Sequence, residues 1–131
     1  MGLDTSHDAF HGAYSAFNRF RQAVAAAMGG SWPPHKDPKL KDTEWYWGRG
    51  FDEKTHPGLF VLMSHSDCDG VISPTDCELV ANDLASLLPA IGEMGRGSGH
   101  VESQGGYGAV TRQFIAGCRA AHAAGEDLEF H

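Results

Sequence analysis

The segment from His65 to Asp76 constrains the fold more than any other part of the chain, because a polar turn is followed directly by a strong helix start. Ser73 suits the N-cap position, Pro74 suits the first helical position, and the acidic Asp76 suits the first turn. The preceding run 58–64 is short, apolar and bounded by turn residues, which is typical of a strand. The sequence therefore predicts a polar strand–helix junction at the edge of the core, where ligands and metals have access.

Three segments have the apolar spacing of amphipathic helices. Ser6 or Asp8 is the expected cap of the first, and Gly29-Gly30 is expected to end it. Pro89 is expected to kink or end the second, and Gly125 is a natural C-cap for the third. The segments and their stripes are 8–28 (Phe10, Ala13, Phe17, Phe20, Val24, Ala27), 73–91 (Cys77, Val80, Leu84, Leu87, Ile91) and 107–124 (Tyr107, Val110, Phe114, Cys118).

Short strands are predicted at 44–47 and 58–64, and the alternating tail 127–131 is expected to pair as an edge strand. The glycine-rich residues 92–108 predict a long loop. Together these elements predict an α+β fold, with about three amphipathic helices packed on one face of a small antiparallel sheet. The chain length fits a single globular domain, 1–131. Short strands with little sheet to share also favour a homo-oligomer.

Net charge and hydropathy argue against two classes of partner, and the cysteine content bears on the compartment. Acidic residues number 17 and basic residues 10, for a net charge of -7, which argues against binding to duplex nucleic acid. No apolar run approaches the roughly 20 residues that span a bilayer, so no membrane partner is expected. The polar N-terminus lacks the apolar core of a signal peptide, and the three cysteines are an odd number. We therefore expect a reducing compartment.

The residues from His65 to Asp76 match the spacing of a twelve-residue calcium loop. Asp67 and Asp69 take positions three and five, and Gly70 takes the sharp turn. The chemistry fits less well, because a histidine occupies the first position and the shorter acid occupies the last. The alternative is a plain turn, shaped by the two aspartates and the glycine, ahead of a helix cap.

A second metal set consists of His65, Cys68 and Cys77, whose residue types suit zinc. No fourth ligand follows at a regular interval, and Cys77 lies on the apolar stripe of a predicted helix, where a core position is the simpler interpretation. No cofactor is expected. A divalent metal held by His65, Asp67 and Asp69 is kept as an alternative.

Polar residues on the first predicted helix form a second candidate site. His7 and His11 are four residues apart and would share one helix face, which continues through Tyr14, Asn18 and Arg21. This face is either solvated surface or the wall of a ligand site. In a ligand site, histidine and arginine would reach an anion and tyrosine would stack on a ring.

An aromatic cluster follows the first predicted helix. Alternation along a strand would place Trp45 and Trp47 on one face and Tyr46 on the other. Exposed rings of this kind can stack on a nucleobase, while Arg49 binds a phosphate. The glycine-rich loop 95–108 is interpreted as a mobile lid.

With these residues identified, the chain resembles a family of small proteins encoded by bacteriophages and prophages. The resemblance implies a phage accessory protein that acts in the cytoplasm of the infected bacterium. Small phage proteins with a polar, aromatic-lined pocket are often counter-defence factors, of which some sequester and others cleave nucleotide-derived immune signals. The motifs that carry the resemblance are Gly2-Leu-Asp-Thr-Ser-His7, Gly12-Ala-Tyr-Ser-Ala-Phe17, Ser64-His-Ser-Asp-Cys-Asp-Gly70, Phe114-Ile-Ala-Gly117 and Glu129-Phe-His131.

Three hypotheses of function follow, and the favoured one is a binding protein that sequesters a cyclic oligonucleotide or a signal of the cyclic ADP-ribose type. Stacking and anion-binding groups are plentiful in the chain, whereas a close acid–base pair cannot be identified from the sequence. The expected roles are stacking for Trp45, Trp47 and Tyr14, phosphate binding for Arg49, Arg21 and His7, and acceptance from ribose or base for Asp67 or Asp69.

The alternative is a phosphodiesterase-like hydrolase. His65 and His7 would then act as general base and acid, or would bind a metal together with Asp67 and Asp69. A third hypothesis is a protein that binds and blocks a host protein. The composite ligand site requires the polar face of the first helix to meet the 65–70 junction.

Overall fold

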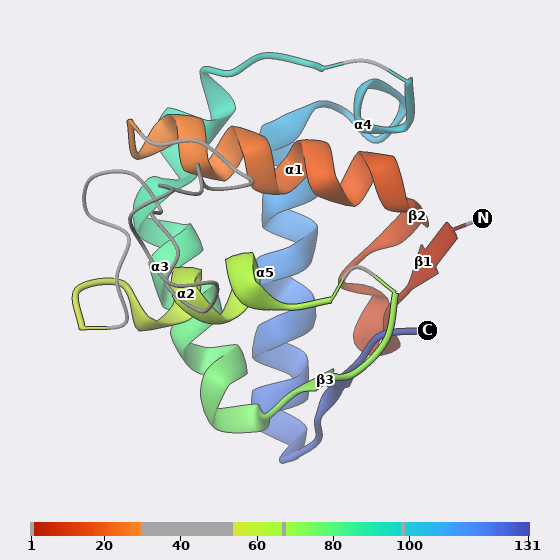
Figure 1. The fold of residues 1–131 in the computed structure, drawn as a ribbon, viewed down its shortest axis with the longest axis vertical. Helices are drawn as coiled ribbons and strands as arrows, with labels where there is room; N and C mark the ends of the chain where they lie inside the picture. Colours follow the sequence, from red (N-terminus) through yellow and green to blue (C-terminus); the bar gives the residue numbers. More distant parts are fainter. Residues whose placement is uncertain (1, 30–53, 67, 98) are drawn as a thin grey trace, which may run out of the picture.

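The computed structural model describes residues 2–29, 54–66, 68–97 and 99–131, and it confirms the α+β class. Figure 1 shows the helices gathered in one body, with the short strands at the side where both termini lie. The elements are β1 (Gly2–Asp4), the 3-10 helix η1 (Ser6–Asp8), β2 (His11–Ala13), α1 (Tyr14–Ala27), α2 (Pro57–Ser64), β3 (Val71–Ile72), α3 (Pro74–Gly92), α4 (Gly99–Ser103), α5 (Tyr107–Ala124) and β4 (Leu128–Glu129).

The core forms mainly between helices. α3 and α5 run in opposite directions and share the most extensive interface, and α1 crosses them near one end (Figure 1). The predicted apolar stripes of α3 and α5 are buried, with Leu87 and Tyr107 half-buried at their margins. Phe17 of α1 is the centre of a cluster of aromatic rings with centroid separations of 5.1 to 6.0 Å, typical of favourable ring pairs. Its partners are Phe10, Phe20, Phe114 and Phe130.

The first helix begins at Tyr14 and not at residue 8, so the predicted caps at Ser6 and Asp8 are wrong. Residues before it form a hairpin in which β1 and β2 pair antiparallel, with Asp4 opposite His11. Leu3 of β1 and Phe10, which directly precedes β2, are both buried. The predicted end near Gly29 is confirmed, since α1 stops at Ala27.

The predicted strand 58–64 is wrong, because residues Pro57–Ser64 form α2. A carboxylate oxygen of Asp83 on α3 accepts hydrogen bonds from the backbone amides of Gly58 (2.8 Å) and Leu59 (3.1 Å). These amides are among the unpaired donors at a helix N-terminus, so Asp83 supplies a cap from another helix. A strand and a buried helix cannot be distinguished from a short apolar run alone. The residue that caps this helix lies 25 residues away in sequence, so the cap could not be recognised from the run itself.

Local signals for the other two helices are confirmed. The Ser73 side chain accepts a hydrogen bond of 3.2 Å from the amide of Asp76, and Gly125 ends α5 in the left-handed conformation. Pro89 lies inside α3, which continues to Gly92. The predicted loop 92–108 contains α4, and its Val101 is fully buried, so this part packs into the core instead of forming a free lid.

The C-terminal residues form the predicted strand, but they are paired on both sides. β4 pairs antiparallel with β3. Phe130 forms a bridge to Thr5, and His131 exchanges two backbone hydrogen bonds with Asp4. The tail therefore joins the N-terminal hairpin to the turn that precedes α3. The strand candidate at 44–47 lies outside the described residues. No helix among those described is both long and apolar enough to cross a membrane.

Candidate functional site

The polar segment after residue 64 connects two helices, because α2 ends at Ser64 and α3 begins at Pro74. The Ser66 hydroxyl accepts from the amides of Cys68 (3.2 Å) and Asp69 (3.4 Å), which closes the turn. Gly70 has φ +91°, a conformation that disfavours any side chain. This geometry agrees with the alternative to a calcium loop that the sequence offered, a plain turn ahead of a helix cap.

His65 is held at both of its ring nitrogens. Nδ1 lies 2.8 Å from the carbonyl oxygen of Ser66, and Nε2 lies 3.0 Å from that of Val71. Carbonyl oxygens only accept, so a ring nitrogen bonds to either of them only as an N–H donor. The ring also lies against Phe130, with centroids 4.2 Å apart. His65 is therefore held in place by the backbone of the turn and by Phe130.

Arg21 is part of the core and not of an open ligand wall, since only 2% of it is exposed. Its Nη1 donates to the carbonyl oxygens of His65 (2.6 Å) and Leu62 (3.2 Å), and its Nη2 donates to Asn18 (2.8 Å). These carbonyls lie at the C-terminal end of α2, where a cation also interacts favourably with the helix dipole. The polar face of α1 therefore does meet the 65–70 junction, and Arg21 uses this contact to hold α2 in place.

His7 and His11 do not share a helix face. His7 lies in η1 with φ 58°, and its Nε2 is 3.4 Å from a carboxylate oxygen of Glu126. His11 lies on β2, with Nδ1 2.5 Å from Asp4 Oδ1. Tyr14, half-buried, begins α1. The prediction of a shared helix face was wrong, because His7, His11 and Tyr14 lie on three different elements.

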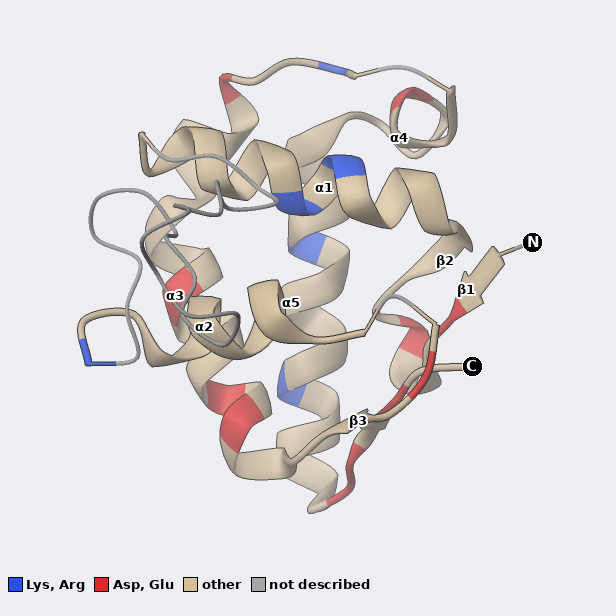
Figure 2. Cartoon of the chain, viewed as in Figure 1, with Lys and Arg blue, Asp and Glu red and all other residues tan. Residues whose placement is uncertain are grey.

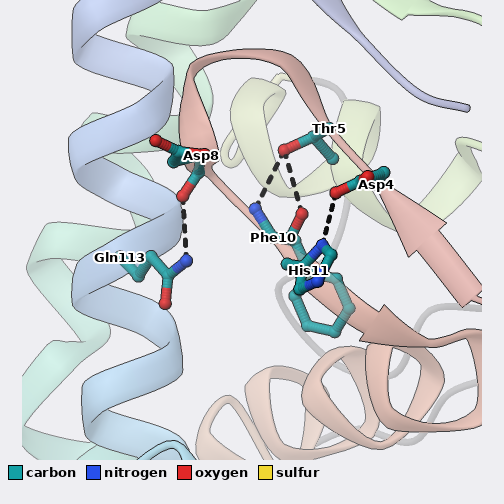
Figure 3. A network of polar contacts seen from close by, with 6 residues as sticks. All are labelled: Asp4, Thr5, Asp8, Phe10, His11 and Gln113. Atoms are coloured by element: carbon teal, nitrogen blue, oxygen red, sulfur yellow. Dashed lines mark hydrogen bonds and ion pairs between the residues drawn. The ribbon is translucent and has the colours of Figure 1, made fainter.

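Figure 3 shows how the hairpin around His11 is built. The Thr5 hydroxyl accepts from the amide of Phe10 (2.9 Å), and Gln113 of α5 donates to the carbonyl oxygen of Asp8 (2.9 Å). These bonds hold the loop between β1 and β2 against α5. The Asp4–His11 pair is exposed at 61% and 73% of the two side chains, on the outside of this loop.

A hollow of about 350 Å³ lies between α2 and the first turns of α3. Its walls are mostly apolar, with Phe60 from α2 and Leu79 from α3, and its polar residues include Asp76. Pockets of at least about 300 Å³ with apolar walls and few polar groups are typical of small-molecule sites. The sequence predicted a strand at 58–64, and a hollow beside a helix was therefore not predicted there. Its lining is Pro57, Phe60, Val61, Ser64, His65, Asp76 and Leu79.

Two other hollows lie on the side of the termini. One of about 190 Å³ includes Asp4 and His11, and one of about 300 Å³ includes His7 and Glu126. Figure 2 shows acidic residues along η1 and β4, beside these two hollows, and also on the first turns of α3. An anionic group approaching the two hollows beside the termini is therefore repelled, in keeping with the net charge of -7.

The predicted zinc set does not assemble. Cys68 is exposed on the turn, whereas Cys77 is buried between α3 and α5, where it shares a hydrogen bond with Cys118. That hydrogen bond and burial raise the pKa of Cys118, and the same bond lowers the pKa of Cys77. Within the described residues, no three His, Cys, Asp or Glu side chains gather in a group that suits a metal.

The calcium interpretation meets a geometric obstacle. Position seven of such a loop supplies its backbone carbonyl to the ion. In this chain that carbonyl belongs to Val71, and it faces the ring of His65.

Four of the predicted site residues lie outside the described residues, so their predicted roles stay predictions: Asp67, Trp45, Trp47 and Arg49. Asp69 is exposed on the turn.

Comparison of the chain with protein-family models, with curated proteins and with solved structures gives no match.

Proposed function

We propose that this protein binds a small nucleotide-type ligand in the hollow between α2 and α3 and sequesters it without cleaving it. The resemblance to phage-encoded proteins supports a counter-defence role in the bacterial cytoplasm, with a cyclic oligonucleotide or a cyclic ADP-ribose type of signal as the ligand. The shape and lining of the hollow support a small molecule. Phe60 and Leu79 offer apolar surface to the face of a base, and Asp76 offers a hydrogen-bond acceptor.

The two contacts of the His65 ring nitrogens are the observation that favours binding over hydrolysis. General acid–base catalysis needs a ring nitrogen within hydrogen-bond reach of the reacting group. Both nitrogens of His65 instead face backbone carbonyls, at 2.8 and 3.0 Å. Its imidazole therefore acts as a fixed part of the wall, and a hydrolase built on His65 would first have to break the turn.

A hydrolase remains the second candidate because of the Asp4–His11 pair. A carboxylate at Nδ1 orients an imidazole so that Nε2 is the basic nitrogen, an arrangement used by histidine bases. The distance of 2.5 Å fits this arrangement, and the pair opens onto a hollow of about 190 Å³. Catalysis would then reside on the hairpin and not at His65.

The discriminating experiment incubates the protein with cyclic dinucleotides, cyclic trinucleotides and ADP-ribose isomers, and separates bound, released and converted species by chromatography. Sequestration predicts that one compound is depleted and is recovered intact after the protein is heated. A new product that disappears in His11→Asn would instead establish the hydrolase. If no compound changes, the sequestration proposal fails and a role in blocking a host protein becomes the better hypothesis.

A matched pair of variants locates the site. Val61 lines the hollow and is half-buried, so Val61→Trp should fill the hollow and prevent binding. Thr75 is exposed on the first turn of α3 and is absent from the lining, so Thr75→Trp should bind like the wild type. Equal binding by both variants would place the ligand elsewhere.

A further inference from the structure

The polar groups that the hollow leaves available are acceptors. The Ser64 hydroxyl donates its proton to the carbonyl oxygen of Phe60 at 2.5 Å, so it presents only lone pairs to the hollow. The two ring nitrogens of His65 face carbonyl oxygens of the turn. The Asp76 carboxylate has no N–H to offer. A ligand that satisfies this lining must therefore bring N–H or O–H donors.

The side chain of Asp76 is available for such a ligand. The capping of α3 uses the backbone amide of Asp76, which donates to Ser73 Oγ at 3.2 Å, and does not require the carboxylate. Asp76 lines the hollow together with Phe60 and Leu79, which come from the two facing helices. A planar group held between these apolar side chains would have a carboxylate acceptor available at its edge.

We propose that the hollow recognises the guanine base, through paired hydrogen bonds from guanine N1–H and N2–H to the two oxygens of Asp76. This inference rests on the proposed function and adds the identity of the base. Two parallel N–H donors match a carboxylate, as they do in bidentate guanidinium–carboxylate pairs. The corresponding edge of adenine places the N1 acceptor beside its amino group, and that lone pair faces a carboxylate oxygen unfavourably. The acidic residues on the first turns of α3 (Figure 2) also favour entry of the base ahead of the phosphates.

Calorimetric titration of the full chain with the 5′-monophosphates of guanosine, inosine, adenosine and xanthosine tests this proposal. Guanosine monophosphate should bind best. Inosine monophosphate lacks the N2 amino group and should bind about tenfold more weakly or worse, since a hydrogen bond to a charged group is lost. Adenosine monophosphate should bind at least as weakly as inosine monophosphate.

The variant Asp76→Asn gives a readout that a structural role would not produce. An asparagine amide presents one acceptor and one donor, which matches the N1–H and O2 of xanthine. Asp76→Asn should therefore lose guanosine monophosphate and gain xanthosine monophosphate. Glu78→Gln is the control, because Glu78 lies on α3 outside the lining, and it should keep the wild-type preference.

The possible results separate this inference from the proposed function. Equal binding of guanine and adenine nucleotides, or an unchanged preference in Asp76→Asn, overturns the guanine inference and leaves sequestration standing. Absence of binding to the four monophosphates, to every cyclic nucleotide and to every ADP-ribose isomer overturns both. Asp76-dependent binding of agmatine without nucleotide binding would assign the hollow to a guanidinium group and also overturn the guanine inference.

Discussion

The imidazole of His65 lies against the phenyl ring of Phe130, with ring centroids 4.2 Å apart and planes inclined by 41°. This contact joins the turn after α2 to the C-terminal strand, which is itself paired with Asp4 of the N-terminal hairpin. The wall of the proposed ligand site is thus supported by residues from both ends of the chain. Changes at the termini should therefore affect the hollow between α2 and α3.

Substitutions at His65 should separate its two roles. His65→Ala loses both the ring contact with Phe130 and the bonds to the turn, and should lower the free energy of unfolding by about 1–2 kcal/mol. His65→Phe keeps an aromatic contact and should cost less. Urea unfolding measures both, with His131→Ala as the exposed control. Equal costs for the two variants would show that the ring contact contributes nothing.

Gly58 is required for the close approach of α2 to α3. A Cβ placed at Gly58 would lie 2.1 Å from the carbonyl oxygen of Leu79, so the backbone must shift to admit it. Gly58→Ala should therefore lower the free energy of unfolding by about 1–3 kcal/mol, the usual cost of overpacking. It should also weaken ligand binding in the hollow, because α2 moves. Urea unfolding and calorimetry measure the two effects.

Gly92 is the matched control for this prediction. It is the last residue of α3, and a Cβ there would meet nothing within 4 Å. Gly92→Ala should leave stability unchanged or raise it by up to about 1 kcal/mol, since alanine favours the helix. A similar loss in Gly58→Ala and Gly92→Ala would contradict the packing argument.

Arg21 should be required for the position of α2. Arg21→Met retains apolar packing but leaves the carbonyls of Leu62 and His65 without their donor, at about 1–3 kcal/mol for each carbonyl left buried and unpaired. Arg21→Lys keeps the charge but cannot reproduce the planar fork, and should give an intermediate loss. Chemical unfolding of both variants tests this order, with exposed Gln22→Ala as the unaffected control. Full stability in Arg21→Met would show that water replaces the guanidinium.

The buried thiol pair predicts a loss of stability in alkali. The pKa of Cys118 is raised by its hydrogen bond with Cys77 and by burial, so the folded protein keeps this proton. An unfolded cysteine ionises near pH 8.5. The contribution of Cys118 is therefore complete below about pH 8.5, and above it the free energy of unfolding falls by up to about 1.4 kcal/mol per pH unit. The lowered pKa of Cys77 acts in the opposite sense, but only below the unfolded value.

Urea unfolding between about pH 8 and 11 measures this alkaline slope. The double variant Cys77→Ala/Cys118→Ala should lose most of it, even though its overall stability is lower. Cys68→Ala removes only the exposed thiol on the turn and should keep the wild-type slope. The assignment is wrong if the double variant retains the full slope.

Signals that act within a few residues were predicted well from the sequence. Ser73 and Pro74 marked the start of α3, Gly125 marked the end of α5, and the apolar stripes of both helices are buried. The turn at Gly70 and the core position of Cys77 were also predicted. Each of these features depends on local backbone preferences or on helical periodicity, and both are determined by residues close together in the sequence.

Distant contacts decided what the local signals left open. The run 57–64 is a helix because Asp83 caps it and because Gly58 admits α3 at close range. The residues around His11 form a hairpin because β1 also pairs with the C-terminus. Arg21 is buried because α2 offers it carbonyls, which no helical pattern could show.

The sequence by itself therefore determined the α+β class, the two long helices and the polar turn between residues 65 and 70. Only the tertiary structure decided that this turn lies between two helices, that His65 is held at both ring nitrogens, and that Asp76 faces a hollow. The reason is physical. Helix propensity and apolar spacing are properties of adjacent residues, whereas a cap, a strand partner or a cavity wall is completed by residues far apart in the chain.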